Sequence, residues 1–174
     1  MRAVDIAGIA LDANSGAPLV VLRERDEPHR LLPIFVGGPE ASSIAIAASG
    51  QQTPRPMTHD VAAALVAALG GTIDTVEVDD LTDGTFFATI IVSGPAGSRR
   101  VGSRPSDAIA LAVRTGAPVW VSDDVLDQAG SLPGPDDAEA SLDPTQIDAE
   151  VESVRTFLDD LDPTDFIDTD IADD

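Results

Sequence analysis

The chain has 174 residues, enough for one domain with a hydrophobic core and an additional segment. Cysteine is absent, which excludes disulfides and thiol-based catalytic or metal sites. The formal net charge is −21, because residues 1–126 carry 15 acidic side chains against 9 arginines (−6) and residues 127–174 carry 16 against one (−15). Such an acidic chain is expected to repel nucleic acid except where its arginines cluster. No stretch has the length of a membrane span or the layout of a secretory signal, so we expect a cytoplasmic protein with no membrane partner.

The first 37 residues predict three strands. Residues 3–12 alternate apolar with small or polar side chains, as a half-buried strand does. After a turn at Asn14-Ser15-Gly16, residues 18–22 form the returning strand of a hairpin. A polar loop then leads to a third strand over residues 31–37.

Three helices are predicted over residues 38–49, 58–69 and 105–115. The first and third begin with a proline in the first turn, where its missing N–H costs nothing. For the second, Thr58 is expected to be the N-cap and Asp60 to favour the positive end of the helix dipole. A glycine follows each apolar run and is expected to end the helix.

The remaining elements are mostly strands. Residues 72–81 and 85–92 flank the turn residues Asp83 and Gly84 and predict an antiparallel hairpin. A short strand near residues 99–101, a buried strand over 118–121 and a last helix from the cap Ser122 to Ala129 complete the pattern. The aromatic residues Trp120, Phe86 and Phe87 are expected in the core.

This order predicts an α+β fold: a mixed, largely antiparallel sheet packed with three to four helices in a single domain, residues 1–129. Residues 130–145 are rich in Gly, Pro and Asp and indicate a linker. Residues 146–161 predict an amphipathic C-terminal helix. Its apolar stripe consists of Ile147, Val151, Val154, Phe157 and Leu158. Residues 162–174 are expected to be an acidic, disordered tail.

Polar residues gather at the three long-helix starts. Their amide groups and partial positive charge favour phosphate, and guanidinium groups bind phosphate in bidentate fashion. A histidine there can act as general acid or base, and acidic side chains can hold a divalent cation such as Mg²⁺. We predict His59, Asp60, Asp107 and Glu40 as catalytic residues, with Arg55, Arg104, Thr58 and Ser106 binding substrate.

These are the parts that a phosphodiesterase needs, but each also has a structural explanation. Serine, threonine, proline and an acidic side chain are what a helix start prefers, at about 0.3–2 kcal/mol each. His59 can make a purely structural hydrogen bond, and Arg55 and Arg104 can pair with the nearby acids. Residue types alone leave both interpretations open.

Four stretches closely resemble the bifunctional nuclease (BFN) domain, in the same order and at similar spacing. They are LPIFVGGPEASSIA, RPMTHDVAAALVAALGG, DGTFFATIIV and RPSDAIALAVRTGAPVWVSDDVL. The resemblance covers roughly residues 2–129, and VRTFLDDLDPTDF resembles the short helical extension that follows this domain in many bacterial members. The chain has Phe35 and Phe87 where Trp and Tyr are frequent in the family, and it is unusually acidic.

The resemblance implies a compact α+β domain that forms a homodimer or higher homo-oligomer and cleaves both RNA and DNA. The strongest motifs of the family match the same eight residues at the helix starts that are predicted above as catalytic or substrate-binding. Two other functions remain open. One is a non-catalytic oligomeric regulatory or anion-binding module, which the predicted amphipathic helix supports. The other is binding of a nucleotide or another phosphorylated metabolite at the helix starts.

Overall fold

The computed structural model describes residues 1–51 and 53–134, which form one seven-stranded mixed sheet with the strand order β3-β2-β1-β7-β4-β5-β6. Every neighbouring pair is antiparallel except β4 and β7. The strands are β1 (Arg2–Leu11), β2 (Pro18–Glu24), β3 (Leu31–Phe35), β4 (Thr72–Thr82), β5 (Thr85–Ser93), β6 (Arg99–Ser103) and β7 (Val119–Val121). The predicted α+β fold with a largely antiparallel sheet is confirmed.

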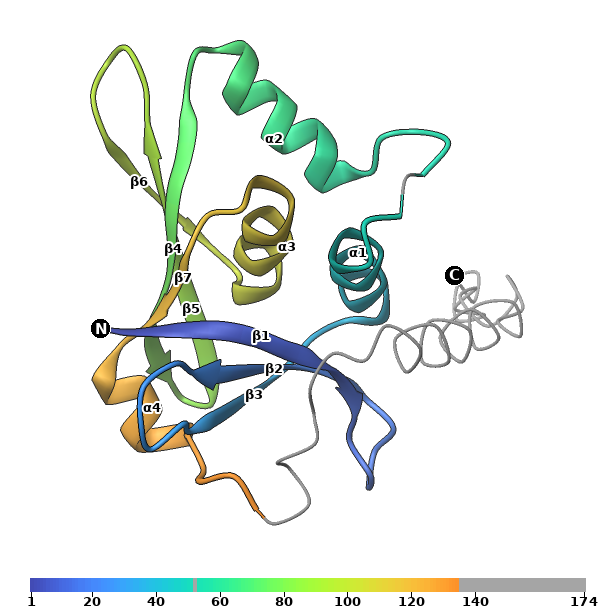
Figure 1. Cartoon of the computed structure of the whole chain (residues 1–174), viewed down its shortest axis with the longest axis vertical. Helices are drawn as coiled ribbons and strands as arrows, with labels where there is room; N and C mark the ends of the chain where they lie inside the picture. Colours follow the sequence, from blue (N-terminus) through green and yellow to red (C-terminus); the bar gives the residue numbers. More distant parts are fainter. Residues whose placement is uncertain (52, 135–174) are drawn as a thin grey trace, which may run out of the picture.

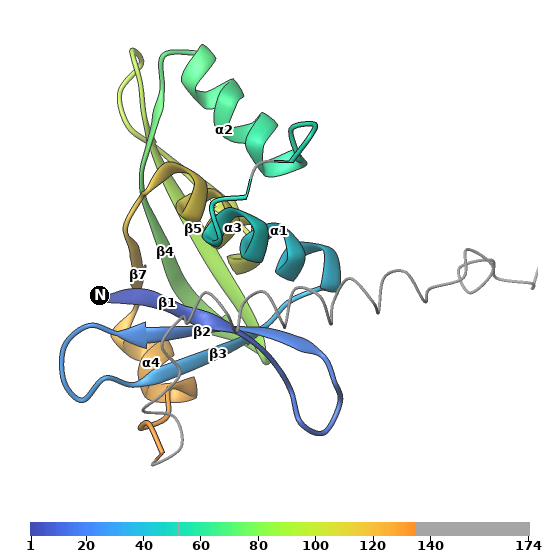
Figure 2. The ribbon, with the colours of Figure 1, turned by 45° about the vertical axis from the view of Figure 1, so that its right-hand side comes forward.

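Four helices pack on this sheet: α1 (Gly38–Ala48), α2 (Thr58–Ala68), α3 (Pro105–Thr115) and α4 (Asp123–Ala129). Figure 1 shows the β1–β2–β3 part of the sheet turned strongly against the β4–β5–β6 part. In both Figure 1 and Figure 2, α1, α2 and α3 lie together on one side of β4, whereas α4 lies apart from them, against β4 and β3. Helix α3 contacts both α1 and α2, although it is far from them in sequence.

Local sequence signals set most of these boundaries. Asp83 (φ 51°) and Gly84 (φ 76°) both adopt the left-handed conformation that a two-residue hairpin turn requires, so the predicted β4–β5 hairpin is confirmed. Helix α3 has the predicted bounds, and Gly116 ends it at φ 74°. Ser122 caps α4 by accepting a hydrogen bond from the Val125 N–H at 3.1 Å, as predicted.

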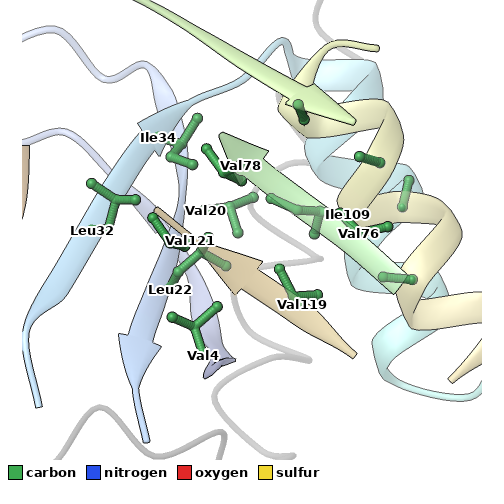
Figure 3. Packing of buried hydrophobic residues seen from close by; sticks show 14 of the residues in the cluster. Val4, Val20, Leu22, Leu32, Ile34, Val76, Val78, Ile109, Val119 and Val121 are labelled. Carbon is green, nitrogen blue, oxygen red and sulfur yellow. The ribbon is translucent and has the colours of Figure 1, made fainter. Parts of the chain in front are cut away.

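The core lies between the two parts of the sheet and α3. Val20 and Leu22 of β2, Val76 of β4 and Ile109 of α3 are fully buried (Figure 3). Helix α3 contributes an unbroken buried run, residues 108–112, which holds its first turn and its last turn at fixed positions relative to the sheet. Both ends of α3 belong to the candidate site described below.

Two aromatic residues do not lie where the sequence predicted. Phe87 is 46% exposed, so its predicted core position is wrong. The buried residues Ala88 and Ile90 share one face of β5 with Phe86, which packs against the core, and strand alternation turns Phe87 to the other face. Trp120 is half-buried rather than part of the core, because Val119 and Val121 on either side of it occupy the inward positions.

The end of the described chain extends past α4. Ser131 and Leu31 exchange two backbone hydrogen bonds of 2.8 and 2.9 Å, and these bonds attach Ser131 to the edge strand β3. The predicted amphipathic helix (146–161), the acidic tail (162–174) and most of the predicted linker (130–145) lie outside the described residues. Within the described ranges, none of the helices has both the length and the apolar character that a membrane crossing needs.

Candidate functional site

The first turns of α1 and α3 meet at Arg104. Its Nη2 lies 3.0 Å from Glu40 Oε1 of α1, and its Nε donates to Asp107 Oδ2 at 2.8 Å. The second nitrogen, Nη2, also donates to Asp107 Oδ1 at 3.0 Å. The Arg104 side chain is nevertheless 65% exposed, so a cation that joins two helix starts also faces solvent.

His59, from the first turn of α2, lies across these two helices. Its Nδ1 is 3.0 Å from Ser43 Oγ of α1, and its Nε2 is 3.1 Å from Asp107 Oδ1 of α3. The imidazole is 14% exposed. One ring therefore bridges a buried hydroxyl and a carboxylate that itself contacts the exposed Arg104.

Arg114, in the last turn of α3, continues the chain of contacts inward. Its side chain is 8% exposed, and its Nε donates to Asp60 Oδ1 of α2. Its Nη2 donates to Ser43 Oγ at 3.0 Å and to the Ser43 carbonyl at 3.2 Å. We call the connected set the polar network; its members are Glu40, Ser43, His59, Asp60, Arg104, Asp107 and Arg114.

The two Arg-Pro helix starts differ in register. Asp60 and Asp107 both occupy the third helical position, but Pro105 is the first residue of α3, whereas Pro56 lies before the N-cap residue Met57 of α2. Arg104 is therefore three residues from its aspartate and pairs with it. The corresponding arginine of α2, Arg55, is five residues away, and Arg114 from α3 pairs with Asp60 instead.

Glycine at position 37 allows Glu40 to reach Arg104. A side-chain carbon added at Gly37 would clash with the Glu40 carboxylate, which folds back over the helix start. The acidic group thus sits at the positive end of α1 and still contacts a cation from α3.

The charges of the network reinforce one another. The Arg104 hydrogen bonds, and then that of His59, hold the pKa of Asp107 below its ordinary value against the opposing effect of burial. The Met57 backbone N–H, followed by Arg114, lowers the pKa of Asp60 in the same way. Asp107 and then Glu40 raise the pKa of Arg104. At neutral pH these groups are therefore all charged.

The network should make stability depend on pH on the acid side. The lowered pKa of Asp107 means that its carboxylate stabilises the fold above the ordinary value of 3.8, and that this contribution is lost as the pH falls through the lowered value. We expect the difference in free energy of unfolding between the wild type and Asp107→Asn to shrink as the pH falls below about 4. Urea denaturation at a series of pH values measures it, and a difference that keeps its full size or grows below about pH 4 would contradict the ion pairing.

Three predicted substrate-binding residues are not brought into the network. Arg55 is exposed, and within residues 1–51 and 53–134 no carboxylate pairs with it. Thr58 is exposed and is the first residue inside α2; the N-cap is Met57, so its predicted capping role is wrong. Ser106 is buried at the start of α3, with 7% of its surface exposed.

The three acidic residues considered as ligands of one divalent cation, Glu40, Asp60 and Asp107, pair with different arginines. Asp60 pairs with Arg114, whereas Glu40 and Asp107 both pair with Arg104. Throughout the described part of the chain, no three His, Cys, Asp or Glu side chains gather closely enough to hold a metal ion. Arginine occupies the place between the carboxylates that a cation would take.

Two members of the network, Ser43 and Arg114, were missed by the sequence interpretation. Arg114 lies seven residues after Asp107, which places both on one face of α3. Ser43 lies three residues after Glu40, which places these two residues on one face of α1. A charged residue inside an otherwise apolar helix, at helical spacing from a predicted site residue, is the signal that could have identified Arg114.

Comparison with known proteins identifies the family of this chain. Residues 20–133 match the family described as the bifunctional nuclease domain. The chain is 39% identical over 166 residues to uncharacterized proteins of two Mycobacterium tuberculosis strains, in alignments that cover 95% of this chain and 98% of theirs. It is 31% identical over 108 residues to Bifunctional nuclease 1 of Arabidopsis thaliana, which covers 60% of this chain and 33% of the plant protein. The family match contains every member of the polar network, and the chain belongs to the bifunctional nuclease domain family.

Proposed function

We propose that this protein is a nuclease that hydrolyses phosphodiester bonds of RNA and DNA at the exposed end of the polar network. The observation that carries the proposal is the position of His59, which is partly exposed and contacts the carboxylate that also binds the solvent-facing Arg104. Family membership supports it, as does the name of the plant relative, Bifunctional nuclease 1. Of the predicted catalytic residues, Glu40, His59 and Asp107 act at the exposed end in this proposal. Asp60 pairs with Arg114 at the buried end of the polar network.

Each residue has a distinct role in this proposal. Arg104 has five N–H donors and can bind a phosphate while keeping one carboxylate contact, so it would neutralise charge on the phosphorus oxygens. Asp107 orients the imidazole, and His59 handles the proton. Glu40 keeps Arg104 beside the helix starts when no phosphate is bound.

A second candidate is a non-catalytic anion-binding or regulatory module. It is favoured by the observation that both ring nitrogens of His59 already have partners. The net charge of −21 also opposes binding of a long polyanion. In this alternative, the network only locks three helices together, and Arg104 binds a small phosphorylated ligand.

A cleavage assay on the purified full chain distinguishes the two candidates. Labelled single-stranded RNA and DNA are incubated with each fraction of a size-exclusion run, with Mg²⁺ and with EDTA. Low and raised salt are both tested, because salt screens the repulsion between this acidic protein and nucleic acid. Cleavage that follows the protein peak supports the nuclease. No cleavage across the peak, together with binding of inorganic phosphate or a mononucleotide, would favour the second candidate.

We also propose that the chain associates with a second copy through α2. Beyond Asp60 this helix contains only Val, Ala and Leu, and none of its residues is buried. Val61, Leu65 and Leu69, at helical spacing, are 45%, 59% and 79% exposed. An apolar stripe of this kind favours burial against a partner surface.

Leu65→Glu should therefore reduce the mass of the assembly, because a charge placed in an apolar contact is costly to desolvate. Leu132→Glu is the matched control, since Leu132 is also exposed but lies beyond α4. Light scattering coupled to size exclusion measures both. An unchanged mass for Leu65→Glu, or a monomeric wild type, would contradict association through α2.

A further inference from the structure

We propose that Arg114 and Ser43 are positioning residues that fix His59 in the neutral tautomer with its hydrogen on Nε2. The tautomer itself does not depend on the proposed function; only its consequence for catalysis rests on that proposal. It starts from Arg114, whose guanidinium has donors and no acceptor. Since Nη2 of this nearly buried side chain points at Ser43 Oγ at 3.0 Å, the serine oxygen must be the acceptor in that contact.

The hydroxyl of Ser43 then has one hydrogen to donate. His59 Nδ1 lies 3.0 Å from the same oxygen, and Ser43 is only 3% exposed, so solvent offers little alternative. If Nδ1 carried a hydrogen, both His59 and Arg114 would donate to one oxygen, and the hydroxyl hydrogen would need another acceptor. No such acceptor contacts Ser43 Oγ among the described residues. The geometry therefore makes Nδ1 an acceptor.

The other side of the ring agrees with this assignment. Asp107 Oδ1 lies 3.1 Å from Nε2, and an ionised carboxylate only accepts hydrogen bonds. Nε2 must then be the donor, which completes a directed chain from Arg114 through Ser43 and His59 to Asp107. Asp60 in turn accepts a hydrogen bond from Arg114 Nε. The buried end of the polar network therefore determines which His59 nitrogen carries the hydrogen at the exposed end.

This direction has a consequence for the site. Nε2–H donates to Asp107, the carboxylate that also accepts from the exposed Arg104, so this side of neutral His59 carries N–H and not a lone pair. A phosphate oxygen that enters there would compete with Asp107 for this hydrogen. A nuclease built in this way would use neutral His59 first as a hydrogen-bond donor to a phosphate oxygen, and not as a base. Ser43 and Arg114 do not touch the substrate in this account, and they act only through the orientation and tautomer of the ring.

Nitrogen-15 NMR of the labelled full chain, above the range where histidine is protonated, tests the inference directly. The sequence has two histidines, and His29→Asn removes one set of ring signals and so assigns the other to His59. We expect an unprotonated Nδ1 and a protonated Nε2 in the wild type. Asp107→Asn should keep this tautomer, because the asparagine amide can donate or accept at Nε2 and Ser43 still donates to Nδ1. Ser43→Ala added to Asp107→Asn should shift His59 toward a mixture of tautomers.

Ser42→Ala is the matched control, because Ser42 is the neighbouring serine of α1 and its hydroxyl donates to the Gly38 carbonyl instead. It should leave the His59 signals unchanged. A wild-type spectrum with the hydrogen on Nδ1 would overturn the inference without any variant, and so would an unshifted tautomer in the folded double variant Ser43→Ala, Asp107→Asn. The readout needs no cleavage, so an inactive chain with the expected tautomer would refute only the proposed function. In an active chain, Ser43→Ala should lower kcat more than it changes KM.

Discussion

His59→Asn is expected to lower the rate of RNA and DNA cleavage by about 10²- to 10⁴-fold, the usual contribution of a positioned proton carrier. Asparagine keeps one donor and one acceptor but does not carry a proton near neutral pH. The variant should stay folded, because the ring lies at the partly exposed end of the polar network. Single-turnover cleavage of one labelled oligonucleotide measures the effect.

The matched control is His29→Asn. His29 lies in the loop between β2 and β3, and Figures 1 and 2 show this loop away from α1, α2 and α3. Its φ of 58° is a conformation that asparagine tolerates well. It should cleave like the wild type. If His59→Asn combined with Asp107→Asn leaves the same residual cleavage as the wild type, that cleavage comes from a contaminant and the proposed site is wrong.

Arg114→Met is expected to have the largest effect on stability among single changes in the network. The substitution keeps the apolar part of the side chain but removes the partner of Asp60 and the donor to Ser43. Breaking a fully buried pair costs about 3–5 kcal/mol. Because Asp60 is 37% exposed and water can solvate part of it, we expect about 2 kcal/mol, or roughly 4–8 °C in Tm.

Arg100→Met provides the comparison for Arg114→Met. Arg100 pairs with Glu77 at 2.9 Å, but its side chain is 60% exposed, and a surface pair of this kind contributes about 0–1 kcal/mol. Urea and thermal denaturation of both variants measure the contrast. Equal effects at the two positions would mean that burial of Arg114 does not matter to the fold.

The fold could be predicted from sequence because its signals are local. The Asp83-Gly84 turn, the Ser122 cap and the apolar run before Gly116 each act within a few residues of the chain. Phe87 was placed wrongly because residue type was given more weight than strand alternation. Ala88 and Ile90 already indicated which face of β5 points inward.

The candidate site could be predicted only in part. Glu40, His59, Arg104 and Asp107 were found because each belongs to a helix start, and the structure brings them together. The sequence could not show which arginine pairs with which aspartate, since that depends on how α2 crosses α1 and α3. The repeated Arg-Pro pattern suggested equal roles for Arg55 and Arg104, but a two-residue difference in helix register separates them.

The central claim is that a phosphodiester binds beside His59 and Arg104. Titration of a dinucleoside phosphate into the labelled full chain, followed through the ring signals of the two histidines, tests it most directly. We expect the His59 signals to shift with saturable dependence on the ligand, the His29 signals to stay in place, and Arg104→Gln to weaken the response. Unmoved His59 signals at ligand concentrations where the chain cleaves or binds nucleic acid would place the site elsewhere and contradict the account.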